Sequence, residues 1–132
     1  LKLNFVDEGD EIAAYWEPSS IYQGYANTLH GGIQSLMHDE IGGWVLYTKA
    51  GTAGVTVDIQ VKFLKAVSTI HGAIAIKGKI TDQTSKFVTI ATRLIDHDGN
   101  VCSTGTVIYR VYPPNIAVGK LGYPGIKAFY TD

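Results

Sequence analysis

Hydrophobic and polar residues alternate along most of the chain with a period of two, which is typical of strands. Over runs of this length, the alternation predicts half-buried antiparallel strands. Polar turns at 81–85 and 96–100 are expected to join the last three strands into hairpins, and Pro113-Pro114 ends the sheet. The expected strands are Leu1–Phe5, Ile12–Trp16, Val55–Phe63, Thr69–Ile80, Phe87–Ile95 and Val101–Tyr112.

The run Val55–Phe63 shows this alternation most clearly. Side chains two residues apart lie on the same face of a strand. One face is expected to hold the apolar residues Val55, Val57, Ile59, Val61 and Phe63. The other face is expected to hold the polar residues Thr56, Asp58, Gln60 and Lys62.

One stretch, Gly31 to about Lys49, is a good helix candidate that ends before Gly51. At 100° per residue, its apolar side chains fall within a sector roughly 140° wide, which we expect to be buried. Glu40 lies in the same sector, so its carboxylate needs a partner, a proton or a water-lined pocket. The sector contains Ile33, Leu36, Met37, Ile41, Trp44 and Tyr47.

A sheet with one helix must cover the apolar side of that helix, and curling the sheet around the helix achieves this. The sequence therefore predicts an α+β fold in which about five to six antiparallel strands wrap around one long central helix. The 132 residues fit a single domain, 1–132, because two domains would each be too small to build a core.

Two features of the predicted helix suggest chemistry. Asp39 shares its side of the helix with Ser35, Gly42 and Gly43, so a ligand or another backbone can approach it, although plain helix packing explains the same pattern. The start, His30-Gly31-Gly32, presents unpaired N–H groups that suit an oxyanion, although a flexible helix entry is the simpler explanation. We expect His38 to be a surface or interface residue.

Composition excludes several classes of function. The formal net charge of −1 gives no global basic field for nucleic acid or anionic lipid. The longest apolar stretch is too short to cross a bilayer, and no signal peptide is apparent, so a cytoplasmic location is expected. One cysteine permits neither an intrachain disulfide nor a cysteine-based zinc site, and we expect Cys102 to be buried and inert.

Several motifs together resemble the PaaI-type hot-dog-fold acyl-CoA thioesterases. The signature of that family is His-Gly-Gly followed, nine residues after the histidine, by an acid on the central helix, and His30 and Asp39 have this spacing. The resemblance covers roughly residues 12–112 and implies a long antiparallel sheet wrapped around one helix. Its motifs are Gln23-Gly24-Tyr25, His30-Gly31-Gly32, Leu36, Asp39-Glu40, Gly42-Gly43 and the strand at 54–64.

The resemblance implies hydrolysis of the thioester of an acyl- or aryl-acyl-CoA, with no metal ion and no cofactor. Asp39 would act as nucleophile or general base, and the Gly31 N–H would polarise the thioester carbonyl. His30 would order the loop or help to bind, and Thr56 would position the attacking water. Further substrate contacts are expected from Gly32, Asn27, Glu40 and Lys65, with Lys65 as the cation for the CoA phosphates.

Some positions depart from the family. Certain relatives place an asparagine six residues before the histidine, where this chain has Gly24, and Asn27 lies only three before. Dehydratases of this fold place an acid about fourteen residues after the histidine, and the corresponding residue here is Trp44, which argues against that reaction. Trp16, Tyr22, Tyr25 and Trp44 could line an acyl or aryl pocket or simply pack in the core.

Helix geometry adds a constraint of its own. Gly31 and Asp39 are eight residues apart, or about 12 Å along a helix axis, so one thioester carbon cannot meet both residues of the same helix. Two antiparallel helices related by a twofold axis bring Gly31 of one subunit to Asp39 of the other. If both residues serve one site, we therefore expect a homodimer, and the resemblance implies the same arrangement, often with two dimers forming a homotetramer. The alternative is a hot-dog domain that binds acyl-CoA without hydrolysing it.

Overall fold

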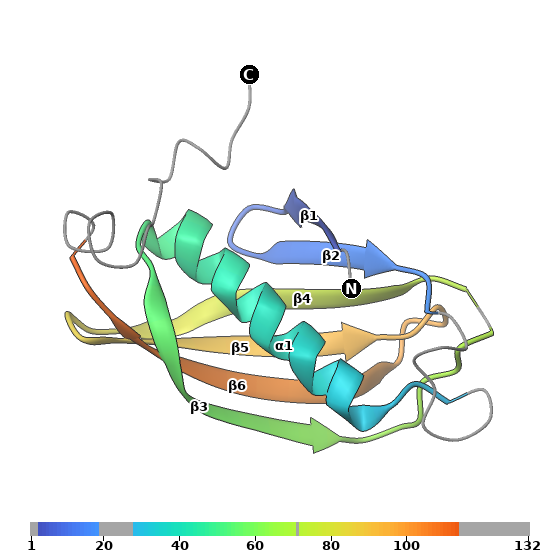
Figure 1. The fold of residues 1–132 in the computed structure, drawn as a ribbon. Coiled ribbons are helices and arrows are strands. Elements are labelled where there is room, and N and C mark those ends of the chain that lie inside the picture. The colour runs from blue at the N-terminus through green and yellow to red at the C-terminus, as the bar shows by residue number, and fades with distance from the viewer. Residues whose placement is uncertain (1–2, 19–27, 71, 114–132) are drawn as a thin grey trace.

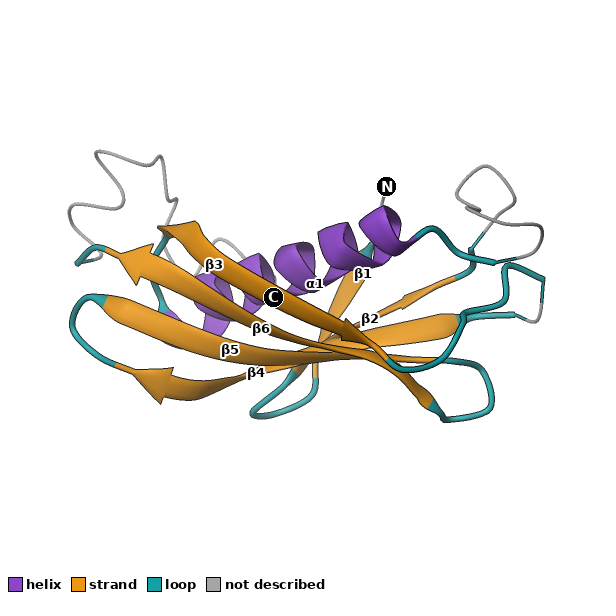
Figure 2. Ribbon diagram, turned by 90° about the horizontal axis from the view of Figure 1, so that it is seen from below, coloured by secondary structure: helices purple, strands orange, loops and turns teal. Residues whose placement is uncertain are grey.

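The computed structural model describes residues 3–18, 28–70 and 72–113. Over these residues, a six-stranded antiparallel sheet carries the long helix on one face, which confirms the predicted α+β architecture (Figures 1 and 2). The strand order is β1-β2-β4-β5-β6-β3, so β1 and β3 are the edges. The elements are β1 (Asn4–Asp7), β2 (Ile12–Trp16), α1 (Gly31–Val45), η2 (Leu46–Ala50), β3 (Gly54–Phe63), β4 (Ile74–Gln83), β5 (Phe87–Ile95) and β6 (Val101–Val111).

Each predicted strand is observed, but two have shifted ends: β1 is Asn4–Asp7 where Leu1–Phe5 was expected, and β4 is Ile74–Gln83 where Thr69–Ile80 was expected. Strand β4 begins at Ile74 rather than Thr69, and the two residues before Thr69 contact the segment that enters the helix. The Leu29 N–H donates to the Val67 carbonyl, and Thr28 forms an isolated bridge with Ser68. These contacts tie the segment before β4 to the segment that enters the helix.

Helix α1 begins and ends at residues that suit those positions. His30 is the N-cap, and its Nδ1 accepts the Gly32 N–H at 2.9 Å. At the other end, α1 continues into the π-helical turn η2, and Gly51 follows with a φ of 67°. Glycine adopts this left-handed conformation at little cost, which confirms that the helical stretch stops before Gly51.

The buried face of α1 differs from the predicted one. Met37 and Ile41 are fully buried as expected, but Leu36 is 43% exposed, and Ile33, Trp44 and Tyr47 are only half-buried. The face against the sheet is therefore rotated by about 100° from the predicted sector. Glu40, also expected inside, is half-buried. The prediction failed because α1 is apolar on two adjacent sides. The residues that face the sheet are Gln34, Met37, His38, Ile41, Gly42 and Val45.

His38 lies in the core, so its predicted surface position was wrong. Its Nδ1 lies 2.6 Å from Thr92 Oγ1, and its Nε2 lies 2.8 Å from Ser103 Oγ. A Cβ atom at Gly105 would meet His38 Nδ1 at 2.9 Å, so this glycine makes room for the ring. Burial lowers the pKa of His38 to about 4, so the ring is neutral at pH 7.

A β-bulge changes the faces of β3 relative to the regular alternation. Thr56 pairs with Tyr109 and Asp58 with Ile108, so Val57 is the extra residue. Residues directly opposite each other share a face, and Tyr109 faces the helix. Thr56 therefore points toward the helix as well, whereas strict alternation predicted that it would share a face with Asp58. Bulges often re-aim a side chain next to a functional site.

The position of Cys102 and the length of the helices agree with the sequence analysis. Cys102 is fully buried, and burial raises the pKa of its thiol. Neither described helix is long and apolar enough to cross a membrane.

His38 makes stability depend on pH in a predictable direction. Its pKa in the folded chain, about 4, lies below the ordinary 6.5, so the unfolded chain binds the proton first. The contribution is fully present above pH 6.5 and is lost as the pH falls toward 4, by about 3 kcal/mol. Urea unfolding at pH 7 and at pH 4.5 should show this loss in the wild type but not in His38→Gln. An equal loss in the two proteins would mean that other groups cause it.

Candidate active site

The start of α1 forms one wall of an open cleft of about 730 Å³. Because His30 Nδ1 accepts the Gly32 N–H, the proton of the neutral ring sits on Nε2. The Gly31 N–H comes at the first helical position and has no acceptor within the helix. The cleft is lined by Thr28, Leu29, His30, Gly31, Gln34, Phe63, Leu64, Lys65 and Ala66.

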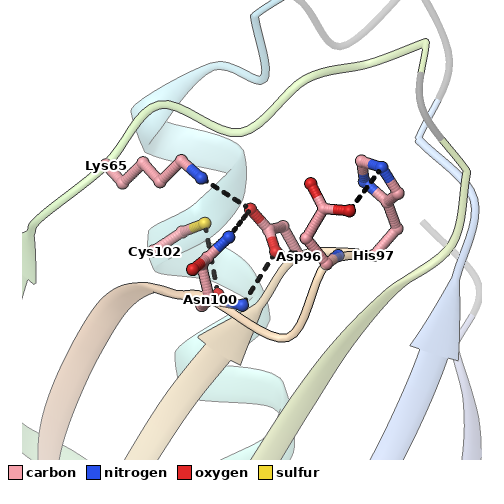
Figure 3. A network of polar contacts seen from close by, with 6 residues as sticks. Lys65, Asp96, His97, Asn100 and Cys102 are labelled. Carbon is pink, nitrogen blue, oxygen red and sulfur yellow. Dashed lines mark hydrogen bonds and ion pairs between the residues drawn. The ribbon is translucent and has the colours of Figure 1, made fainter.

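Lys65 lines this cleft and forms an ion pair with Asp96, which Figure 3 shows. Lys65 Nζ lies 3.3 Å from Asp96 Oδ2, and the N–H groups of Asp98 and Asn100 donate to Asp96 Oδ1 at 3.0 and 2.9 Å. Partial burial alone would raise the pKa of Asp96, but the Asn100 N–H and the Lys65 ammonium hold it well below its usual range. The turn between β5 and β6 thus places a cation near Gly31.

Gln34 is a polar residue of this cleft that the sequence did not point to. It is buried, and its Oε1 has no hydrogen-bond partner among the described residues. A buried acceptor without a partner is costly, and a ligand with an N–H donor would satisfy it.

Asp39 lies more than two turns further along α1, with two hydroxyl groups at one of its carboxylate oxygens. Thr56 Oγ1 donates to Asp39 Oδ1 at 2.9 Å. The Tyr109 hydroxyl lies 3.1 Å from the same oxygen and 2.9 Å from the Asp39 carbonyl oxygen. Burial and the Asp39 charge raise the pKa of Tyr109, so its hydroxyl keeps its proton and acts as a donor.

The glycine at position 42 explains how Tyr109 reaches the helix. A Cβ atom there would lie 2.6 Å from the Tyr109 hydroxyl oxygen. The close approach that the sequence suggested for the two adjacent glycines is therefore confirmed at Gly42. At Gly43 the nearest such atom is 4.0 Å away.

A second, smaller cleft of about 260 Å³ opens at Asp39. Three of its eight lining residues are aromatic, and the Trp44 and Tyr47 rings meet edge to face with centroids 6.2 Å apart. Glu40 contributes a second carboxylate. The cleft is lined by Asp39, Glu40, Gly43, Trp44, Tyr47, Gly54, Thr56 and Tyr109.

The predicted site residues thus fall into two groups. His30, Gly31 and Lys65 line the cleft at the start of α1, whereas Asp39, Glu40 and Thr56 line the cleft further along it. Gly32 lies at the helix start, where its N–H is paired with His30. Tyr109 was missed, because its contact joins residues 70 positions apart and no local pattern marks it. Asn27, Tyr22 and Tyr25 lie outside the described residues.

Metal ligation has no obvious site in the described part of the chain, where no group of three His, Cys, Asp or Glu residues is placed to hold an ion. The two clefts instead offer a carboxylate, two hydroxyls, a helix N-terminus and a lysine.

Known structures resemble this fold along most of its length. Zebra fish thioesterase superfamily member 2 is 19% identical, with a TM-score of 0.75 over 84% of this chain and 82% of its own. A Streptococcus mutans UA159 protein, smu.793, bound to acetyl CoA, is 17% identical, with a TM-score of 0.79 over 86% and 91%.

A hypothetical thioesterase protein with coenzyme A, from Streptococcus pneumoniae TIGR4, is 19% identical, with a TM-score of 0.77 over 86% and 90%. These likenesses confirm the hot-dog fold. No curated protein matches the chain. The family model of the thioesterase superfamily matches residues 26–103, which include the helix, its glycine-rich start and Asp39. The chain therefore belongs to the thioesterase superfamily.

Proposed function

We propose that this protein is an acyl-CoA thioesterase that uses Asp39 to cleave the thioester of an acyl- or aryl-acyl-CoA. The observation that carries the proposal is the Asp39 carboxylate, which lies in an aromatic cleft with two hydroxyls at Oδ1. Among the described contacts none involves Oδ2, so this oxygen is available to a substrate or a water molecule. The two similar structures that hold acetyl CoA or coenzyme A support a CoA thioester as the substrate class.

The reaction adds water to a thioester and gives a carboxylic acid and a free thiol. As general base, Asp39 takes a proton from the water that attacks the carbonyl carbon. As nucleophile, it forms an acyl-carboxylate anhydride that water then hydrolyses. In both routes the carbonyl oxygen gains negative charge, which the Gly31 N–H at the helix start would stabilise. The thiolate is a good leaving group, so no strong general acid is needed.

The cleft at the start of α1 suits the thiol portion of the substrate. Lys65 retains ammonium donors beyond the one used by Asp96, and these would meet a phosphate oxygen of CoA. His30, which is exposed and lines this cleft, would offer its Nε2–H as a further donor. The acyl group would then lie toward the aromatic cleft at Asp39.

The two clefts are joined only if a second copy of the chain takes part. Gly31 and Asp39 are about 12 Å apart along the helix axis and line different clefts. The edge strand β3 and the outer side of α1 expose Val55, Val57, Ile59, Phe63 and Leu36. An edge with so many exposed apolar side chains is a ready template for a second chain. A twofold dimer through this surface would bring Gly31 of one subunit toward Asp39 of its partner.

The first prediction concerns Asp39. Thiol release from short-chain, long-chain, phenylacetyl and benzoyl CoA should fall about 10²–10⁴-fold in Asp39→Asn, because the amide can act as neither base nor carboxylate nucleophile. The preferred substrate of the wild type would indicate the size of the acyl pocket. Circular dichroism and urea unfolding should show that the variant remains folded.

Two results would contradict this proposal. Turnover near the wild-type rate in Asp39→Asn would remove Asp39 from the chemistry. No release from any CoA thioester by the folded wild type, together with tight binding of one, would indicate a non-catalytic acyl-CoA-binding module.

The oxyanion donor can be tested by removing one N–H group. In Gly31→Pro the N–H is lost, while proline suits the first helical position and His30 before it is already extended. We expect kcat to fall about 10²–10³-fold. Gly31→Ala, the matched control, keeps the N–H, and its Cβ would meet Phe63 at an ordinary 3.5 Å. Equal losses in both variants would show that the added side chain, not the N–H, is responsible.

Mixed dimers test whether the site is shared. Asp39→Asn and Gly31→Pro subunits, each inactive alone, should regain about a quarter of wild-type activity when refolded together, because half of the dimers are mixed and each of these has one intact site. No recovery in confirmed mixed dimers would place both groups on one chain.

The proposed dimer surface can be disrupted by one charge. Ile59 is 40% exposed on β3, and Ile59→Glu would bury a carboxylate at the twofold interface. We expect a folded monomer by analytical ultracentrifugation and a large loss of thiol release. Ile70→Glu makes the same change at a residue 63% exposed outside β3 and should remain dimeric and active. A fully active Ile59→Glu monomer would exclude a shared site.

A further inference from the structure

We propose that Tyr109 is a positioning residue for Asp39. Its hydroxyl acts with that of Thr56 to hold Oδ1, which leaves Oδ2 as the atom that reacts. This inference rests on the proposed thioesterase function, and it assigns a role to a residue that the sequence did not point to.

Three contacts fix the carboxylate relative to the helix. Thr56 Oγ1 donates to Asp39 Oδ1 at 2.9 Å, and the Tyr109 hydroxyl lies 3.1 Å from the same atom. The Tyr109 hydroxyl also lies 2.9 Å from the Asp39 carbonyl oxygen, so its one hydrogen is shared between the backbone and the side chain of the same residue. Tyr109 thereby restrains the rotation of the Asp39 side chain with respect to α1.

The sheet brings both hydroxyls to one atom. Thr56 on β3 and Tyr109 on β6 are a cross-strand pair, and the bulge after Thr56 places both side chains on the helix side. If Val57 continued the regular alternation instead of forming the bulge, Thr56 would share the face of Asp58, which is turned away from Tyr109 and the helix. The bulge and the tyrosine are therefore parts of one arrangement.

Tyr109 is rigid, which suits a positioning role. It is only 4% exposed, and its hydroxyl packs against Gly42 of α1 so closely that a Cβ atom at this position would clash with it. Its raised pKa keeps the proton on the oxygen at neutral pH, so it can donate to the carboxylate.

The consequence for reactivity follows from where the hydrogen bonds fall. An oxygen that accepts two hydrogen bonds has fewer lone pairs for attack or proton transfer than one that accepts none. Oδ2, which takes no contact from the described residues, is therefore the reacting oxygen. Small errors in the position of a reacting group slow the reaction, and a misplacement of 1 Å lowers the rate about 10²-fold.

The test compares two Tyr→Phe variants in thiol release from the preferred CoA thioester. In Tyr109→Phe we expect kcat to fall about 10- to 100-fold, while KM changes less than about twofold, because only the aim of Asp39 is altered. Tyr15→Phe is the matched control, since the Tyr15 hydroxyl also donates to a carboxylate, Glu8 Oε2 at 2.6 Å, but lies on β2 away from the site. It should leave kcat and KM unchanged.

A double-mutant cycle tests whether the two hydroxyls act on the same oxygen. Thr56→Val, Tyr109→Phe and the double variant are compared for kcat. If both hydroxyls hold Oδ1, the loss in the double variant differs from the product of the single losses. A purely multiplicative result would overturn the shared role of the two residues.

Gly42→Ala displaces the Tyr109 hydroxyl without removing it, because the added Cβ would lie 2.6 Å from its oxygen. We expect a fall in kcat comparable to that of Tyr109→Phe, again with little change in KM. This variant keeps the inference testable if Tyr109→Phe proves too unstable, which urea unfolding would reveal.

The outcomes separate this inference from the proposed function. If Asp39→Asn retains turnover, Asp39 is not the reacting group, and the proposed function is contradicted independently of Tyr109. If Asp39→Asn is inactive but Tyr109→Phe and Gly42→Ala keep the wild-type kcat, the reaction stands and the positioning role of Tyr109 is overturned. A loss confined to KM would likewise overturn it, because it would place Tyr109 in substrate binding.

Discussion

The packing of α1 against the inner face of the sheet is the constraint on which the site depends. Met37, Ile41 and Val45 are fully buried there, and they fix the rotation of the helix about its axis. Neighbouring helical residues point about 100° apart, so this rotation sends His38 into the sheet and leaves Asp39 at the border of the contact, toward β3 and β6. A helix rotated to bury the predicted sector would turn the carboxylate away from both hydroxyls.

Polar groups in the core reinforce this rotation. His38 satisfies both ring nitrogens with Thr92 and Ser103, so any slip of the helix along the sheet would strand a buried polar ring at considerable cost. Two glycines leave the space that these polar groups need. Gly105 makes room for the imidazole, and Gly42 makes room for the Tyr109 hydroxyl. Each glycine forfeits some local stability, and each admits a polar group that determines where Asp39 stands.

The sequence was sufficient for features that depend on local pattern and insufficient for those that depend on tertiary register. Alternation and turn residues predicted the strands, and the spacing of Gly31 and Asp39 correctly separated them along one helix. The buried side of α1 was not predictable, because Leu36, Trp44 and Tyr47 form a second apolar side that competes with the first. The β3 bulge and the contact of Tyr109 arise from pairing between β3 and β6, which no short window contains.

The helix that positions Asp39 also separates it from the N–H donor at Gly31, so one chain does not bring the two groups of the proposed reaction together. A straight helix cannot shorten the distance of about 12 Å between an N–H donor at its start and a carboxylate two turns on, so one chain offers two half-sites. The half-site at Asp39 is preorganised within the chain by Thr56 and Tyr109, whereas the oxyanion donor of the proposed reaction must come from a second chain. In the proposed reaction, the fold of one chain positions the carboxylate, and a second chain would complete the site. The apolar side of α1 that faces away from the sheet and the exposed β3 edge are the surfaces through which the proposed dimer would bring two copies of the helix together.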